Sequence, residues 1–165
     1  MKASDFIALK ISKLTNHVFT GQGGSVVHLL DSLSKIKNVK IIPSQNEQGA
    51  SLAADAYTRS CGKLGVVIAT SGPGILNTLQ GMACSFFDSI PGIYISGAPV
   101  ISALKKNEKN RQVGFQEMDV VNLVKSTTKY AVTITNPNRI SYEIEKCIHL
   151  AQCERPGPTL IDIPD

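Results

Sequence analysis

Hydrophobic residues in this chain form two kinds of pattern, short unbroken runs and longer stretches with apolar residues three or four positions apart. An unbroken run predicts a buried strand of a parallel sheet, and i, i+3, i+4, i+7 spacing predicts an amphipathic helix. The strongest strand signal is the run 65–70, and a clear helix follows Asn46, with Ala50, Ala54 and Tyr57 on one face. The same reasoning predicts strands at 18–20, 39–42, 93–96, 130–135 and 159–163, and helices at 4–14, 26–33, 47–62, 76–87, 118–124 and from 137 onward.

Regular alternation of strands and helices predicts an α/β fold, in which three αβα layers enclose a mostly parallel six-stranded sheet. The length of 165 residues is that of one domain, spanning 1–165. Ligands of such sheets bind beyond the carboxyl ends of the strands. Because the segments 21–24, 43–50 and 71–74 follow strands, we expect them to converge on that edge.

Composition narrows the class of protein. Hydrophobic residues make up 42% and charged residues 18%, which is typical of a globular chain. The net charge of +4 is spread along the chain, and its only local concentration is the basic run at 105–111. This run has no interleaved aromatic residues, so we expect a solvated loop and no nucleic-acid partner. No apolar stretch approaches the length of a membrane span, and no signal peptide is evident, so we expect a cytoplasmic protein without a membrane partner.

The cysteines contain no Cys-x-x-Cys pair, and the histidines do not complete a zinc-like spacing. Cys84 and Cys147 fall on apolar helix positions, so we expect both to be buried free thiols. In the helix around Cys84, the residues expected to face inward are Leu76, Leu79, Ala83, Phe86 and Phe87.

The two glycine-rich loops match no common phosphate or nucleophile motif. Val26 stands where the third glycine of Gly-x-Gly-x-x-Gly would fall after Gly21, which argues against a dinucleotide site. Ser71-Gly72-Pro73-Gly74 lacks the Gly-Lys-Ser/Thr of a P-loop and the Gly-x-Ser-x-Gly of a serine hydrolase. In most proteins, a tight strand-to-helix turn explains a loop of either kind.

Glu47 is the candidate functional carboxylate, because it lies where a strand end turns into the first turn of a helix. From there it would face a ligand above the strand ends. The alternative is a glutamate that only complements the helix dipole.

Several segments together resemble one family. Asn46-Glu47-Gln48-Gly49-Ala50 and the residues 53–59 resemble the glutamate helix of thiamine diphosphate enzymes of the acetolactate synthase type. The segment 69–77 is similar to that family's second motif. The segments 88–91, 96–97, 115–119 and 155–164 match in order, so the resemblance covers the whole chain. It implies the N-terminal pyrimidine-binding domain of such an enzyme.

The resemblance assigns roles to individual residues. Glu47 would be catalytic, hydrogen-bonded to ring atom N1′ of the cofactor and promoting its imino tautomer. The family often has Tyr-Pro where this chain has Gly21-Gln22, so neither residue is carried over. The other implied cofactor neighbours are Gly23, Gly24, Pro73, Asn77 and Gln116, and Phe115 and Gln116 would line the substrate pocket.

The family holds the diphosphate through Mg²⁺ on a Gly-Asp-Gly segment in another domain, and no Gly-Asp-Gly occurs here. The central and diphosphate-binding domains are therefore expected outside this chain, which is either an excised domain or a separate subunit. Its expected partners are further copies, as a dimer or tetramer, or a subunit carrying the diphosphate-binding domain. FAD is possible by resemblance but has no support in these residues.

By resemblance, the complete enzyme would decarboxylate a 2-oxo acid and transfer the carbanion to an acceptor, as acetolactate synthase does. One alternative is a split-subunit 2-oxo acid decarboxylase, in which a proton is the acceptor. Another is a non-catalytic binding domain of the same fold, against which the retention of Glu47 argues.

Overall fold

The computed structural model describes residues 1–104 and 109–165, and within them six strands form one sheet in the order β2-β1-β3-β4-β6-β5. All neighbouring strands run parallel. The expected α/β fold with a six-stranded sheet is therefore confirmed, and the sheet is parallel throughout. The strands are β1 (His17–Thr20), β2 (Lys40–Pro43), β3 (Gly65–Ala69), β4 (Gly92–Ala98), β5 (Tyr130–Thr133) and β6 (Pro158–Pro164).

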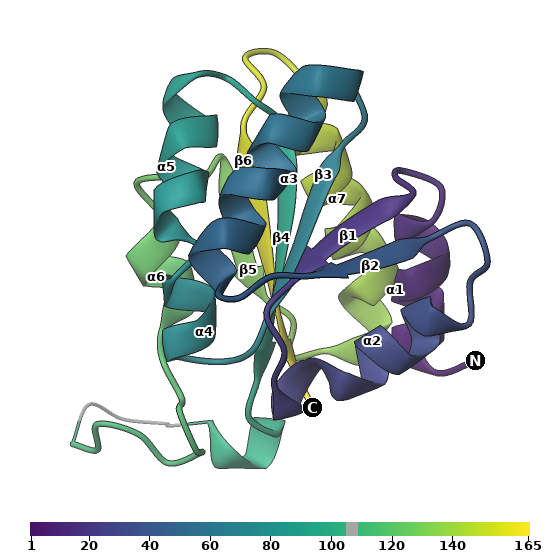
Figure 1. Ribbon diagram of the computed structural model, residues 1–165. Helices are drawn as coiled ribbons and strands as arrows, with labels where there is room; N and C mark the ends of the chain where they lie inside the picture. Colours follow the sequence, from purple (N-terminus) through teal and green to yellow (C-terminus); the bar gives the residue numbers. More distant parts are fainter. Residues whose placement is uncertain (105–108) are drawn as a thin grey trace.

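Helices cover both faces of this sheet. Figure 1 shows α3 crossing in front of the strands with α4 and α5 beside it, whereas α7 lies behind them. The helices are α1 (Ala3–Ile11), α2 (Val27–Ser34), α3 (Glu47–Cys61), α4 (Pro73–Leu76), α5 (Leu79–Phe87), α6 (Val120–Val124) and α7 (Ile140–Gln152). Short 3-10 turns are η1 (Gly24–Val26), η2 (Ile101–Ala103) and η3 (Pro137–Arg139).

The sheet divides the core into two clusters of buried side chains. Alternate residues of the fully buried strand β3 point to opposite faces, so Val66 and Ile68 join one cluster while Val67 and Ala69 join the other. We call the side under α1, α2 and α7 the aliphatic face, and the side under α3, α5 and α6 the small-residue face. The aliphatic face includes Ile7, Leu29, Leu33, Ile95 and Ile144, and the small-residue face includes Ala50, Ala54, Met82, Tyr94 and Leu160.

The segment 76–87 departs from its sequence prediction, because it forms two helices instead of one. Asn77 and Thr78 have ψ angles of −19° and −9°, closer to a 3-10 turn than to an α-helix. Such a turn rotates the following residues relative to a continuous α-helix. The predicted inward set is therefore correct only in part. Leu79 packs against the small-residue face, but Phe87 is 68% exposed, and the buried residues of α5 are Gly81, Met82 and Ser85.

The cysteine prediction is half correct. Cys147 is buried on α7, and its burial raises the pKa of the thiol to about 12. Cys84 is exposed, contrary to expectation, because α5 turns that side of the helix outward. Of the basic run at 105–111, residues 105–108 lie outside the described residues, and Lys109, Asn110 and Arg111 are exposed.

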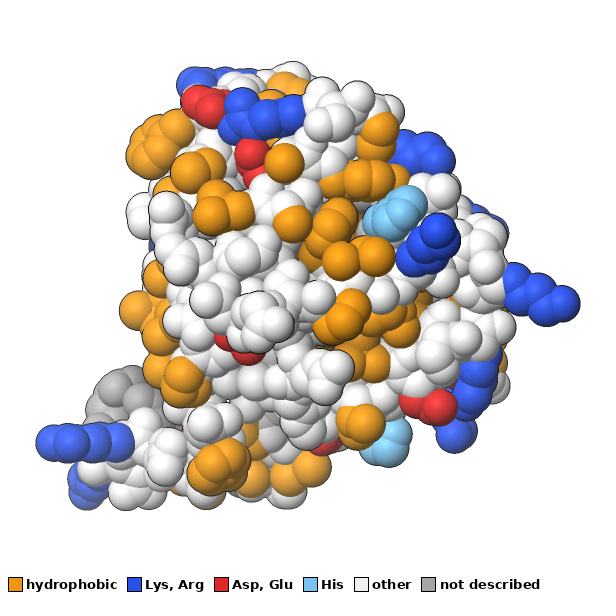
Figure 2. Space-filling view, in the orientation of Figure 1, with side chains coloured by type: hydrophobic (Ala, Val, Ile, Leu, Met, Phe, Trp, Pro, Cys, Tyr) orange, Lys and Arg blue, Asp and Glu red, His pale blue; other side chains and the backbone are white. Residues whose placement is uncertain are grey.

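Charged side chains are spread over the visible surface. Figure 2 shows Lys and Arg side chains dispersed around the outline of this face instead of gathered in one patch. None of the helices described is both long enough and apolar enough to pass through a bilayer.

Candidate functional site

The site begins at the first turn of α3, where Glu47 and the helix cap are separate residues. The Asn46 side chain caps the helix, since its Oδ1 accepts a hydrogen bond from the Gly49 backbone N–H at 2.8 Å. Gly62 ends the helix in the left-handed conformation at φ 69°. Because Asn46 supplies the cap, the Glu47 carboxylate is available for another role.

The Glu47 carboxylate is half-buried and is oriented by Asn77. Asn77 Nδ2 donates a hydrogen bond to Glu47 Oε2 at 3.0 Å. Oε1 accepts no hydrogen bond from the residues that the structure describes. One carboxyl oxygen is therefore held in place, and the other can meet a ligand in the positive field of the helix N-terminus.

Backbone without side chains borders this carboxylate on two sides. A Cβ placed on Gly21 would lie 2.5 Å from Glu47 Oε1, and one placed on Gly74 would lie 3.5 Å from the same atom. Gly21 follows β1, and Gly74 lies in the short helix α4 after β3. The Glu47 side chain thus packs closely against the Gly21 backbone, whereas a Cβ at position 74 would be only in ordinary contact with Oε1.

Thr70 joins the two glycine-rich loops to each other. A Cβ on Gly23 would lie 2.2 Å from Thr70 Cβ, and one on Gly74 would lie 2.5 Å from Thr70 Cγ2. The Ser25 hydroxyl lies 2.9 Å from Thr70 Oγ1 and accepts a hydrogen bond from the Ser71 backbone N–H at 3.0 Å. The loops after β1 and β3 thus pack on one threonine.

The segment around Gln116 rests on the turn after β3. Gly72 has a φ of 60°, and a Cβ there would lie 2.4 Å from the Gln116 carbonyl oxygen. Gln116 itself has a left-handed φ of 55°. Both conditions at Gly72, the positive φ and the close contact, require glycine.

The structure thus brings most of the candidate residues to one edge. Glu47 and Asn77 are hydrogen-bonded, and Pro73 begins the short helix α4 between Gly72 and Asn77. Gly24 starts η1, and no described atom lies within 4 Å of a Cβ built on it. The Phe115 side chain is 81% exposed and extends into solvent.

Sequence reasoning missed Gly21, Ser25 and Thr70. Each acts through a contact with a loop that follows a different strand, and no spacing along the chain reports such a contact. The one available signal was the Gly21-Gln22 departure from the family pattern.

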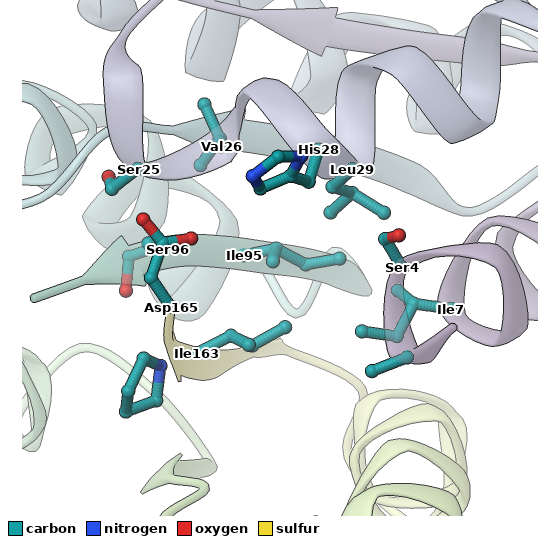
Figure 3. Close-up of a pocket in the computed structure, with 13 residues that line it drawn as sticks. Ser4, Ile7, Ser25, Val26, His28, Leu29, Ile95, Ser96, Ile163 and Asp165 are labelled. Carbon is teal, nitrogen blue, oxygen red and sulfur yellow. The ribbon is translucent and has the colours of Figure 1, made fainter. Parts of the chain in front are cut away.

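A separate cavity of about 230 Å³ lies on the aliphatic face. Figure 3 shows it between α1, the η1–α2 segment and the ends of β4 and β6, with Ile7, Leu29, Ile95 and Ile163 around it. Glu47 does not line this cavity. Within residues 1–104 and 109–165, no group of three or more His, Cys, Asp or Glu residues is placed to hold a metal ion.

Comparison with known proteins agrees with the resemblance seen in the motifs. Residues 1–123 match the family described as thiamine pyrophosphate enzyme, N-terminal TPP binding domain. The acetolactate synthase large subunit of Buchnera aphidicola subsp. Schizaphis graminum is 36% identical over 154 residues, covering 93% of this chain and 26% of that protein. The acetolactate synthase of Arthrospira platensis is 37% identical over 151 residues, covering 90% of this chain and 25% of that protein.

The acetolactate synthase large subunit of Corynebacterium glutamicum is 39% identical over 147 residues, covering 89% of this chain and 22% of that protein. The chain therefore spans about a quarter of the length of these relatives.

Proposed function

The chain belongs to the thiamine pyrophosphate enzymes, whose N-terminal TPP-binding domain it matches, and on that premise we propose that it forms the aminopyrimidine-binding half of an acetolactate synthase-like site. Glu47 is the proposed catalytic residue. The observation that carries this proposal is the Glu47 carboxylate itself. It lies beyond the strand ends, and it is oriented by Asn77 while Asn46 supplies the helix cap.

The residues present fit the pyrimidine ring of this cofactor. A ring nitrogen needs a carboxyl group as a proton partner, and Oε1 of Glu47 is the available atom. In this chain the backbone of Gly21 and Gly74 borders that carboxyl group. Gly23, Gly24 and Pro73 are the proposed neighbours of the ring.

Bound thiamine diphosphate supplies a thiazolium carbon that becomes a nucleophile when its proton is removed. Within this chain, Glu47 holds or releases a proton at the ring nitrogen, and Asn77 fixes the direction of the carboxyl group. Gln116, held against Gly72, is proposed to approach the reacting side of the site together with Phe115. The proposed reaction of the complete enzyme decarboxylates a 2-oxo acid and transfers the product to an acceptor, supported by the acetolactate synthase relatives.

The diphosphate and its Mg²⁺ are proposed to bind to another domain or a partner subunit, so the working site requires association. Exposed apolar side chains between β4 and α6 support an interface there: Val100 and Ile101 are each 46% exposed, and Val113 is 53% exposed. We propose that these three side chains, together with Phe115, meet a second copy in a dimer or tetramer, or a partner subunit. The free cysteines favour a reducing, cytoplasmic setting.

The Glu47→Gln variant tests the proposal when the diphosphate-binding domain is supplied. Glutamine fills the same space and can hydrogen-bond, but it cannot exchange a proton. Loss of a general acid–base group costs ~10²–10⁴-fold in rate, or about 3–5 kcal/mol of barrier. The measurements are the rate of cofactor C2 proton exchange by NMR and the melting temperature.

The neighbouring cap supplies a matched control. Asn46→Ala removes the hydrogen bond to Gly49 and should cost about 1 kcal/mol of stability while C2 exchange stays near the wild-type rate. Glu47→Gln should show the reverse pattern. Wild-type exchange together with a lowered melting temperature in Glu47→Gln would mean that Glu47 only stabilises the helix.

A further inference from the structure

The segment between η2 and α6 contains a tight turn with Phe115 and Gln116 at its centre. The Glu117 backbone N–H donates a hydrogen bond to the Gly114 carbonyl oxygen at 3.2 Å, which closes the four-residue turn. Gln116 has a φ of 55°, and Phe115 is not among the residues with positive φ. This is the pattern of a type II turn, whose second central position favours glycine or asparagine. The glutamine there is therefore strained.

A left-handed glutamine persists only where the surrounding structure holds it. Two glycines bring this turn against neighbouring segments. Gly114 is buried, and a Cβ on it would lie 2.4 Å from the Cβ of Pro99, directly after β4. On the other side, a Cβ on Gly72 would lie 2.4 Å from the Gln116 carbonyl oxygen. The turn is thus packed between the end of β4 and the loop after β3.

The Glu117 side chain links the two ends of the turn. It is half-buried, and its Oε2 accepts hydrogen bonds from the backbone N–H groups of Val113 at 2.7 Å and Gly114 at 3.4 Å. Carboxylate oxygens are strong acceptors for backbone N–H groups. Because a side chain at the end of the turn binds backbone at its start, the two central residues are held between these contacts.

We propose that Glu117 is a positioning residue for Phe115 and Gln116. By accepting hydrogen bonds from Val113 and Gly114, its carboxylate keeps Gln116 in the left-handed conformation and the turn in place. Without that carboxylate, Gln116 relaxes to a negative φ, and both central side chains lose their fixed direction. The consequence for substrate binding rests on the proposed function, but the dependence of the turn on Glu117 does not.

The nuclear Overhauser effect between the Gln116 amide and Cα protons reports the turn in the chain without cofactor, because these protons lie closer together at positive φ. In Glu117→Ala this effect should weaken to the level of residues with negative φ. The Val113 amide should exchange with solvent about tenfold faster, which is the loss of one hydrogen bond to a charged group. A Gln116 effect of wild-type strength in Glu117→Ala would overturn the proposal.

The conservative variant Glu117→Gln separates the hydrogen bonds from the bulk of the side chain. Its amide oxygen can still accept from Val113 and Gly114, so the Gln116 effect should stay near the wild-type strength. A loss as complete as in Glu117→Ala would refute the role of the accepted hydrogen bonds.

Asp119→Ala is the matched control, because it removes another carboxylate cap two residues along the chain. Asp119 Oδ1 accepts a hydrogen bond from the Asn122 backbone N–H at 3.1 Å at the start of α6. This variant should lower the melting temperature while the Gln116 effect persists. Loss of the Gln116 effect in both alanine variants would show a general sensitivity of the segment and would also overturn the proposal.

The consequence for substrate is tested with the diphosphate-binding domain supplied. In Glu117→Ala, kcat/KM for the 2-oxo acid should fall by about 10–100-fold, and Glu117→Gln should restore it. Cofactor C2 proton exchange should stay near the wild-type rate, because Glu47 and Asn77 are unchanged. An unchanged kcat/KM in Glu117→Ala would refute the proposed role of Phe115 and Gln116. The measurements on the turn contain no thiamine diphosphate, so a failed Glu47→Gln test would leave their result standing.

Discussion

The two faces of the sheet are packed in different ways. The aliphatic face is filled by long branched side chains such as Leu33 and Ile95. On the small-residue face, backbones approach closely: a Cβ on Gly81 would lie 2.4 Å from Ser51 Oγ, and one on Gly65 would lie 2.5 Å from the Ala54 carbonyl oxygen. The aliphatic face is stabilised by the packing of large side chains. On the small-residue face, small residues let the helix and strand backbones pack closely together. Because α3 packs on the small-residue face, the close packing of its backbone determines the position of Glu47 at its first turn.

This difference predicts opposite sensitivities to substitution. The aliphatic face should suffer most from the removal of atoms, which leaves cavities. The small-residue face should suffer most from added atoms, which must displace a helix.

Leu33→Ala should give the largest loss of stability. Leu33 is fully buried on α2 within the aliphatic face, and its truncation leaves a cavity that costs about 2–5 kcal/mol. Urea denaturation followed by circular dichroism measures the change. Val27→Ala, on the same helix but 53% exposed, is the control and should shift stability by less than about 0.5 kcal/mol. Equal effects of the two variants would contradict volume-based packing on this face.

The next effect depends on pH and comes from Asp162 of β6. Leu160 belongs to the small-residue face, and Asp162, two residues on, points to the same side. Burial raises the pKa of Asp162 to about 6, against the hydrogen bonds that its carboxylate accepts from Ser96 at 2.5 Å and Thr133 at 3.0 Å. The folded protein therefore binds this proton more tightly than the unfolded chain does.

The sign of the pH dependence follows from that difference. The contribution of Asp162 to stability is complete below the unfolded pKa of 3.8 and is lost as pH rises through about 6. The loss is on the order of 3 kcal/mol. The free energy of unfolding should be measured from pH 4 to pH 7 for the wild type and for Asp162→Asn, which cannot ionise. Parallel curves for the two proteins would show that Asp162 does not titrate in this range.

Gly65→Ala tests the close packing under α3 and should cost about 1–3 kcal/mol. The obstacle is the backbone of Ala54, which cannot turn aside as a side-chain end can. Gly92→Ala is the control, because Gly92 pairs with Gly65 across the sheet and its Cβ would lie 3.4 Å from the Tyr94 ring, an ordinary contact. If Gly92→Ala destabilised the protein as much as Gly65→Ala, sheet effects would outweigh helix proximity.

The same contrast explains what the sequence could predict. Helix α3 follows from local signals, namely the alanine spacing from Ala50 and the terminal Gly62. The buried strands follow from unbroken apolar runs such as β3. Phe87 was misplaced because the turn at Asn77 and Thr78 shifts the helix phase without a proline or glycine to mark it.

The candidate site was predictable only in part. Glu47 could be singled out from its place at a strand-to-helix junction. Its contacts with Asn77, 30 positions away, and with Gly21 depend on how β1, β2 and β3 align side by side. That alignment is set by packing of the whole sheet and leaves no periodic pattern in the sequence.

The strand order has a consequence for the folding of the site. β1 lies between β2 and β3 in the sheet. The three segments around Glu47, between Gly21 and Asn77, therefore follow three strands that are successive in the chain and adjacent in the sheet. Closing chain segments of this length costs little more entropy than closing shorter ones, since the cost grows only with the logarithm of loop length. Contacts between nearby parts of a chain also form faster than distant ones. As the chain emerges during synthesis, the residues that hold Glu47 are all available before β4, β5 and β6 have been made.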